Sequence, residues 1–349
     1  MISKINPLKA LLLIGGIILS VAFFDQSKAF ASEIEHQAIV NNHHISISAE
    51  DYERLLGLGF LDNEIMNMDL EEYELNENLT GELLVTDTVY IKTIEKDSSL
   101  LPDSFLANND RKSAKDIMEQ NTEVIGSIEM TKEDFEKEVR LAKEKLAETN
   151  IISPFATDSY TTSYKTVTTS VNKLSNSTFR VKNNCNWSIM PKNRSYDVIG
   201  VALNHNWAGN KGSEYGKQTW KLHDLYDNTF STGSAVYSTS KDASYWNLGM
   251  EGFSVKMNLK NDDYAIVAGL GYIGYKVSSL DLYMYYSVGK TITSPARIDA
   301  YGRYAHATTK IKPSFGFGVT TSPAVGFNFS LAKSDNFDIT NKTVATLIF

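Results

Sequence analysis

The side chains that most often carry out chemistry are dispersed along this 349-residue chain. No His-Glu-x-x-His helix, His-x-His pair or Gly-x-Ser-x-Gly turn occurs, although each of these would gather metal ligands or a nucleophile. The sequence therefore offers no standard metal site and no hydrolase nucleophile. We expect solvated or structural roles for the six histidines, which are His36, His43, His44, His205, His223 and His306.

Cys185 is the only cysteine, which excludes an internal disulfide and any multi-cysteine zinc or iron–sulfur site. A reactive thiol needs a neighbouring group to lower its pKa, and no histidine lies near Cys185 in sequence. A small buried apolar side chain is the favoured interpretation, and a reactive thiol is the alternative.

Two further motifs invite a chemical interpretation. Gly269, Gly271 and Gly274 match the dinucleotide-binding spacing, but the chain continues into a strand-like run at 280–288 instead of the helix that receives a pyrophosphate. Glycines of a turn or bulge explain them better, and no cofactor is expected. Asp262 and Asp263 are adjacent in a turn, whereas a glycosidase pair must face each other across a cleft. An extracellular hydrolase is therefore only a third alternative.

The first 31 residues have the pattern of a secretory signal peptide. Lys4 and Lys9 precede an apolar run over 10–24, and Ala29-Phe30-Ala31 supplies the small residues that signal peptidase requires. A membrane anchor would need about 20 apolar residues, and this run is shorter. Cleavage after Ala31 would leave Ser32 first, so the recognition site comprises Ala29, Ala31 and Ser32. The tripartite pattern with Lys-rich flanks is typical of a bacterial export signal.

Charge divides the remaining chain in two. Residues 32–157 hold 11 Lys and Arg against 28 Asp and Glu, a net charge of −17, whereas residues 158–349 hold 20 against 13, a net charge of +7. All four Trp and 15 of the 18 Tyr lie in the second part. Such a shift in composition marks a domain boundary, and Ser153-Pro154 would end a helix there. We predict an acidic region at 32–150, a linker at 151–159 and a basic domain at 160–349.

The two regions also differ in hydrophobic period. In the acidic region Ser48, Asp62, Asp69 and Thr131 are expected to cap short helices, and 85–94 reads as a strand. Beyond residue 158, ten short runs rich in Val, Thr, Tyr, Phe and Trp alternate with Asn, Asp, Gly and Ser clusters. The predicted fold is mainly β: an antiparallel β-sandwich of about ten strands, preceded by a small acidic α-helical region.

Blocks of sequence in both regions resemble one family. The first blocks are 46–56, 58–60, 64–68 and 71–73, and those of the second region are 164–166, 180–184, 195–201, 255–259 and 299–306. Together they resemble uncharacterised secreted proteins of Bacillus-like Gram-positive bacteria. The resemblance covers most of the mature chain, and it implies the compartment and the two-part layout but no catalytic residue.

The basic, aromatic β domain predicts a non-enzymatic protein that binds the cell envelope or another anionic surface, such as a wall polymer or a lipid headgroup layer. Nucleic acid has the right charge, but an exported protein is not expected to meet it. Alternatively, the positive charge balances the acidic region, which would then pack on the basic domain within one chain. No binding is needed to explain the charge in that case.

One hairpin supports a second class of function. Apolar residues alternate with small or polar ones on both sides of a turn, as they do in the inserted hairpins of β-pore toxins. These residues are Phe315, Phe317, Val319, Val325, Phe327 and Phe329. A hairpin that buries one face in a sandwich core has the same pattern. A membrane-active protein masked by its acidic region is therefore the alternative function.

Overall fold

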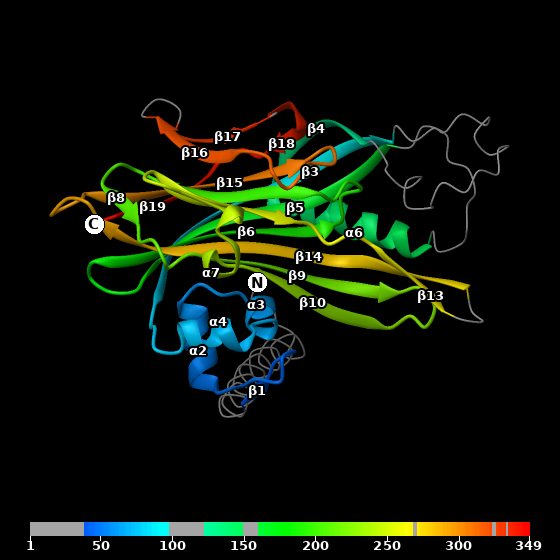
Figure 1. Cartoon of the computed structure of the whole chain (residues 1–349), viewed down its shortest axis with the longest axis horizontal. Helices are drawn as coiled ribbons and strands as arrows, with labels where there is room; N and C mark the ends of the chain where they lie inside the picture. Colours follow the sequence, from blue (N-terminus) through cyan, green and yellow to red (C-terminus); the bar gives the residue numbers. More distant parts are fainter. Residues whose placement is uncertain (1–37, 98–121, 149–159, 268–270, 323–325, 333) are drawn as a thin grey trace, which may run out of the picture. The chain divides into compact units, whose positions relative to one another are not determined.

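The computed structural model describes residues 38–97, 122–148, 160–267, 271–322, 326–332 and 334–349 (Figure 1). They divide into two compact units. The helical unit comprises 38–56 and 61–78, and the β unit comprises 57–60 and the described residues from 79 onward. The predicted signal-peptidase residues Ala29, Ala31 and Ser32 lie outside the described residues.

Short capped helices form the helical unit, as the sequence predicts. Ser48 Oγ accepts a hydrogen bond from the backbone N–H of Asp51 (3.0 Å), and the Asp69 carboxylate accepts one from Glu72 (2.9 Å). Asp62 does not cap: the N-cap position is Leu61, and Asp62 lies in the first turn. The elements are β1 (Ile39–Val40), β2 (Ser46–Ile47), α2 (Ala49–Gly57), α3 (Asp62–Met66) and α4 (Leu70–Asn76).

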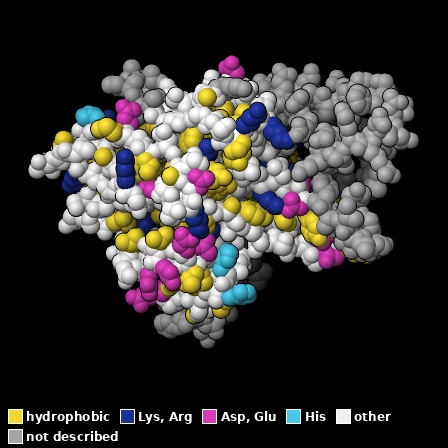
Figure 2. Space-filling model, in the orientation of Figure 1, with side chains coloured by type: hydrophobic (Ala, Val, Ile, Leu, Met, Phe, Trp, Pro, Cys, Tyr) yellow, Lys and Arg dark blue, Asp and Glu magenta, His cyan; other side chains and the backbone are white. Residues whose placement is uncertain are grey.

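The helical unit is strongly acidic. Its described residues include ten Asp and Glu against one arginine, Arg54. Acidic side chains gather over these helices in the space-filling view (magenta in Figure 2). The negative charge of the N-terminal region is thus concentrated before residue 79.

The β unit contains a large antiparallel sheet in which β14 is the central strand, because it pairs with β6, β9, β8 and β13. The order along the sheet is β10 (Phe230–Tyr237), β9 (Tyr215–Asp224), β14 (Gly271–Lys290), β6 (Thr178–Ile189), β5 (Tyr160–Lys173), β3 (Glu82–Asp97) and β4 (Thr122–Met130). Two shorter strands, β8 (Trp207–Gly209) and β13 (Asp263–Val267), also pair with β14.

A smaller antiparallel sheet faces the large one. Its order is β11 (Trp246–Gly249), β12 (Gly252–Asn258), β7 (Tyr196–Leu203), β15 (Arg297–Ala307) and β18 (Phe337–Ile339), with β19 (Thr343–Ile348) also pairing with β15. The other elements are α6 (Lys132–Glu148), α7 (Thr239–Asp242), η2 (Ala243–Tyr245), η3 (Ser334–Asn336) and the hairpin of β16 (Phe317–Ser322) and β17 (Gly326–Leu331).

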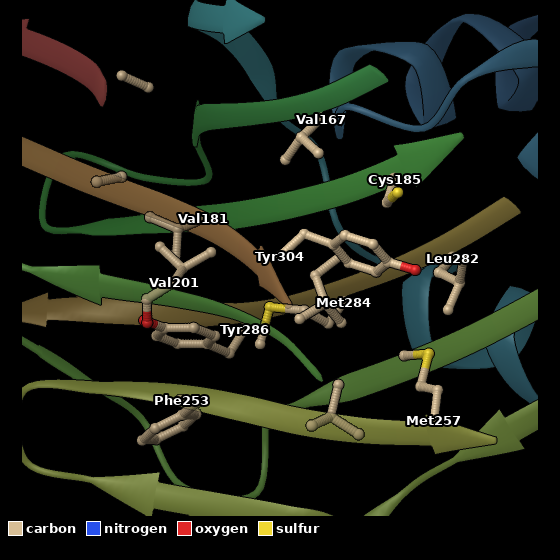
Figure 3. Close-up of a cluster of buried hydrophobic side chains, with 14 of the residues drawn as sticks. Val167, Val181, Cys185, Val201, Phe253, Met257, Leu282, Met284, Tyr286 and Tyr304 are labelled. Atoms are coloured by element: carbon tan, nitrogen blue, oxygen red, sulfur yellow. The ribbon is translucent and has the colours of Figure 1, made fainter. Parts of the chain in front are cut away.

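The main core lies between the two sheets (Figure 3). Tyr286 of β14 meets Phe253 of β12 with ring centroids 4.3 Å apart, and its hydroxyl donates to the Val201 carbonyl (2.8 Å). The sheets approach closely at Gly302, where a Cβ atom would lie 1.7 Å from Thr169 Oγ1. Only glycine fits that position without displacing the facing sheet.

The outer face of the small sheet is also covered. Phe317, Val319 and Phe329 of the β16–β17 hairpin pack with Val198 and Ala305 in a second cluster. Covering both faces explains why β7 is buried along almost its whole length, unlike a strand with one face in water.

Helix α6 packs on the large sheet through one apolar stripe. Thr131 Oγ1 accepts from the Asp134 backbone N–H (3.2 Å), which is the predicted cap. Phe135 and Val139 form a small buried cluster with Tyr164 of β5. Most other residues of the helix are exposed, as expected of an amphipathic surface helix, and Glu138 accepts a hydrogen bond from the Tyr164 hydroxyl (2.8 Å).

The antiparallel β-sandwich is confirmed, with more strands than the ten predicted. The compact units divide at a different place from the boundary predicted at 151–159, and 32–150 holds strands of the large sheet as well as helices. Strand β3 pairs with β5 from Glu82 opposite Lys173 to Lys96 opposite Tyr160, and β4 extends the sheet beyond β3. The strand predicted at 85–94 is therefore part of the sandwich, and the compact units divide near residue 79.

The fragment 158–349 should not fold as a stable domain. It lacks β3 and β4, so the edge of β5 and the contacts of Val89 and Ile91 would be lost. Burial of two such side chains adds about 3–6 kcal/mol to the free energy of unfolding, which is a large part of the total for a domain. In far-UV circular dichroism melts, we expect one cooperative transition for the fragment 57–349 and none for 158–349. Equal melting of the two fragments would contradict this strand assignment.

Candidate functional site

Several loops and the C-terminus meet at one end of the sandwich, where β8 and the C-terminus lie (Figure 1). We call this the loop end and define it as residues 204–206, 210–214, 250–251, 290–297 and 348–349. Backbone hydrogen bonds join its parts: Thr291 N–H donates to Asn206 O (2.9 Å), and Phe349 N–H donates to Ala296 O (3.0 Å). The loops are therefore fixed to one another as well as to the strands.

An aromatic base supports the loop end. The Phe349 ring lies 5.7 Å from the Trp207 ring and 5.5 Å from the Phe179 ring. Trp207 is buried, and its indole N–H donates to the Arg297 carbonyl (2.9 Å). Buried aromatic side chains with satisfied polar atoms make a rigid support.

Four apolar side chains project from this base into solvent. The exposed fractions are 93% for Met250, 75% for Ile348, 56% for Phe349 and 46% for Ile292. All four lie in the loop end, and exposed apolar side chains of this kind are typical of an interaction surface.

Met250 owes its position to a tight turn. It lies with Glu251 between β11 and β12, whose last pair is Gly249 opposite Gly252. Gly252 has a φ of +156°, and a Cβ atom there would lie 2.3 Å from the Val201 carbonyl oxygen. The Leu203 N–H donates to Glu251 O (2.9 Å), which holds the turn against β7.

The loop end is also basic. Lys211, Lys290 and Arg297 are exposed, although Arg297 also pairs with Asp299 (2.9 Å), and Glu251 is the one exposed acidic side chain among the described residues of the loop end. The Lys290 ammonium lies 5.7 Å from the centre of the Phe349 ring, so a cation and an exposed apolar surface adjoin. Basic and hydrophobic side chains are both visible there (left in Figure 2).

The predicted hairpin residues occupy a different place. Phe315, Phe317, Val319 and Phe329 pack against the outer face of the small sheet, and Phe329 is only 9% exposed. Val325 and the side chain of Phe327 lie outside what the structure describes. The apolar face of the hairpin is thus covered in this conformation, and a membrane role stays a prediction.

The histidines are not gathered into a site. His43 and His44 are exposed, and His223 stacks on Phe230. His306 is fully buried and its Nδ1 lies 2.9 Å from Asp197 Oδ2. Within the described part of the chain, no group of three or more His, Cys, Asp or Glu side chains could hold a metal ion.

Sequence reasoning missed the loop end because its residues are adjacent only in space. The available signal was local: Met250 stands between two glycines in a turn, where an apolar side chain has no core to enter. Ile292 likewise follows the end of a long strand. None of the helices in the described ranges has the length and apolar character needed to cross a bilayer.

No family model and no curated protein matches this chain. Among solved structures, the collagen-binding domain from a Staphylococcus aureus adhesin matches with a TM-score of 0.20 and 10% identity, covering 37% of this chain and 75% of that domain. A structure titled "Pore forming protein" matches with a TM-score of 0.25 and 9% identity, covering 53% of this chain and 87% of that one. At these TM-scores neither likeness carries an argument about function.

Cys185 should be unreactive in the native protein. The side chain is fully buried between the sheets, and burial raises the pKa of its thiol well above the ordinary value, so little thiolate forms at neutral pH. We expect no reaction with a thiol-specific disulfide reagent in buffer and one equivalent in guanidinium chloride. Rapid reaction of native Cys185 with the reagent would instead support the alternative, a reactive thiol.

Proposed function

We propose that this is a secreted, non-enzymatic protein whose β unit binds an anionic lipid surface through the loop end. The observation that carries the proposal is the juxtaposition of four exposed apolar side chains with three exposed cations on a rigid aromatic base. Secretion rests on the leader pattern of residues 1–31, and a Gram-positive source rests on the resemblance of the sequence blocks.

Both parts of the loop end contribute to such binding. Transfer of an exposed Ile, Met or Phe side chain from water is worth about 1.5–3 kcal/mol when burial is complete. Each Lys or Arg near an anionic membrane surface adds about 1 kcal/mol. Four apolar chains and three cations therefore approach the ~8 kcal/mol of micromolar affinity.

A lipid surface is favoured over an anionic wall polymer because of the apolar side chains. A hydrated polyanion would take the charges of Lys211 and Lys290 but offers no apolar phase to Met250 or Ile348. The acidic helical unit opposes binding, since ten carboxylates against one arginine are repelled by the same anionic surface. Packing of that unit on the basic domain, predicted from the charges, remains part of the proposal.

A second candidate function is membrane permeabilisation by the β16–β17 hairpin. One observation favours it: β16 and β17 pair only with each other among the described strands, so no ladder to another strand holds the hairpin in place. Its apolar face must leave the small sheet before it could enter a bilayer.

Sedimentation with vesicles tests the lipid proposal. We expect the full chain to bind phosphatidylglycerol vesicles, to bind phosphatidylcholine vesicles weakly, and to lose affinity with salt because exposed cations are screened. Changing Met250 and Ile348 together to Asp should weaken binding at least about tenfold. Changing Lys211 and Lys290 to Gln should flatten the salt dependence.

The matched control is Leu141→Asp, because Leu141 of α6 is 52% exposed and lies outside the loop end. Equal loss of binding in this variant would contradict a localised site. Binding to purified walls but not to vesicles would replace the lipid by a wall polymer.

A disulfide lock tests the hairpin. A Cβ atom at Gly318 would lie 3.7 Å from the Asn247 Cγ atom, so Asn247→Cys with Gly318→Cys should join β16 to β11. If the hairpin permeabilises membranes, dye release from vesicles should stop in the oxidised variant and return on reduction. Equal release in both states, or none in either, would remove this candidate.

A further inference from the structure

Lys165 of β5 is a lysine with no access to solvent. Its ammonium lies 4.7 Å from the Trp187 ring and 5.8 Å from the Tyr304 ring, so aromatic side chains from both sheets enclose it. Lysine side chains normally extend their charged end into water. This one is instead directed into the space between the sheets.

The partner of Lys165 is a carboxylate from the opposite sheet. Asp338 of β18 is 11% exposed, and its Oδ2 lies 3.0 Å from Lys165 Nζ. The two residues are 173 positions apart in sequence. An amine and a carboxyl group held in hydrogen-bonded contact are the two reactants of an amide condensation.

Hydroxyl groups orient the pair. Lys165 Nζ donates to Thr93 Oγ1 (3.1 Å), and Ser127 Oγ donates to Asp338 Oδ2 (2.6 Å). The Ser127 bond polarises the carboxyl group and fixes its rotation. The Lys165 amine therefore meets an oriented carboxyl group rather than a freely rotating one.

Groups able to relay a proton stand beside the pair. His306 of β15 is the cross-strand neighbour of Asp338, and its Nδ1 bonds to Asp197. Its Nε2 has no hydrogen-bond partner among the described residues and lies 4.0 Å from Glu95 Oε1. A buried histidine between two carboxylates, with one nitrogen unused, is suited to accept and return a proton.

We propose that Lys165 and Asp338 condense to an intramolecular amide bond that joins the two sheets covalently. The Lys165 ammonium gives up a proton, and the amine lone pair attacks Cγ of the protonated Asp338 carboxyl group. The nitrogen then loses its second proton to the hydroxyl oxygen of the carboxyl group. The bond between Cγ and that oxygen breaks, and the oxygen leaves as water. Ammonium and carboxylate thus become an amide and water, and no oxidant or other reagent is required.

The Asp338 carboxyl group is ionised before the reaction. Burial acts to raise the pKa of Asp338, but the neighbouring Lys165 ammonium and the Ser127 hydroxyl hold it below its ordinary value. One proton must therefore pass from Lys165 to Asp338 before attack, so the reaction is a slow maturation step that follows folding. The product removes two buried charges whose desolvation is unfavourable.

The intact mass of the purified full chain tests the proposal. We expect a mass lower than the sequence requires by one water molecule, and a tryptic peptide in which Lys165 is uncleaved and joined to the segment containing Asp338. Lys165→Arg and Asp338→Ala should each restore the full mass and lower the melting temperature. Lys256→Arg, at a buried lysine that bonds to the Pro313 carbonyl, should retain the loss of water.

Two results would overturn the proposal. One is the full mass for the unaltered, folded chain, since the reaction would then not occur. The other is a loss of water that persists in Lys165→Arg, because it would have arisen elsewhere. The mass and the branched peptide of the unaltered chain decide the matter even if the variants fold poorly.

Discussion

The contact of Tyr286 with Phe253 joins the inner faces of the two sheets, and the rest of the β unit depends on that packing. Tyr286 lies on β14, the strand from which both halves of the large sheet extend. Its hydroxyl reaches the Val201 carbonyl in the small sheet, so the same side chain both fills the core and fixes the separation of the layers. Gly302 sets the closest approach at another point, because any side chain there would strike Thr169.

This packing allows the loop end to expose apolar surface. A flexible loop that carried Met250 or Ile348 would fold back onto the protein to bury it. Here the turn before Gly252 and the final pairs of β19 are held by backbone hydrogen bonds to neighbouring strands. The surface is already ordered in the folded protein, so little conformational entropy is lost when a partner binds.

The sequence predicts features that depend on near neighbours. The caps at Ser48, Asp69 and Thr131 were predictable because donor and acceptor lie three residues apart, and strands such as β5 and β6 were predictable from their composition. The pairing of β3 with β5 was not predictable, because the change of charge along the chain assigned these two strands to different domains. Short strands such as β8 and β18, with three residues each, carry too few residues to show a period.

Contacts between residues far apart in sequence also determine the role of β5. The run of β5 is rich in Ser and Thr, yet its alternate residues enter the core. Val167 and Val171 join the apolar cluster, whereas Lys165 meets a carboxylate from a segment 173 residues away. Nothing in the neighbourhood of either residue indicates that pairing.

The core therefore changes from apolar to charged along the sandwich. The proposed binding surface and the proposed amide bond lie at different ends of it. On β15, Arg297 belongs to the loop end, whereas His306 lies nine residues along the same strand, about 30 Å away at ~3.3 Å per residue. The apolar part of the core lies behind the loops, and the charged part lies towards the opposite end. With its single cysteine buried, the chain forms no internal disulfide. An amide at the charged end would give the sandwich a covalent link between its layers while leaving the loop end unaltered.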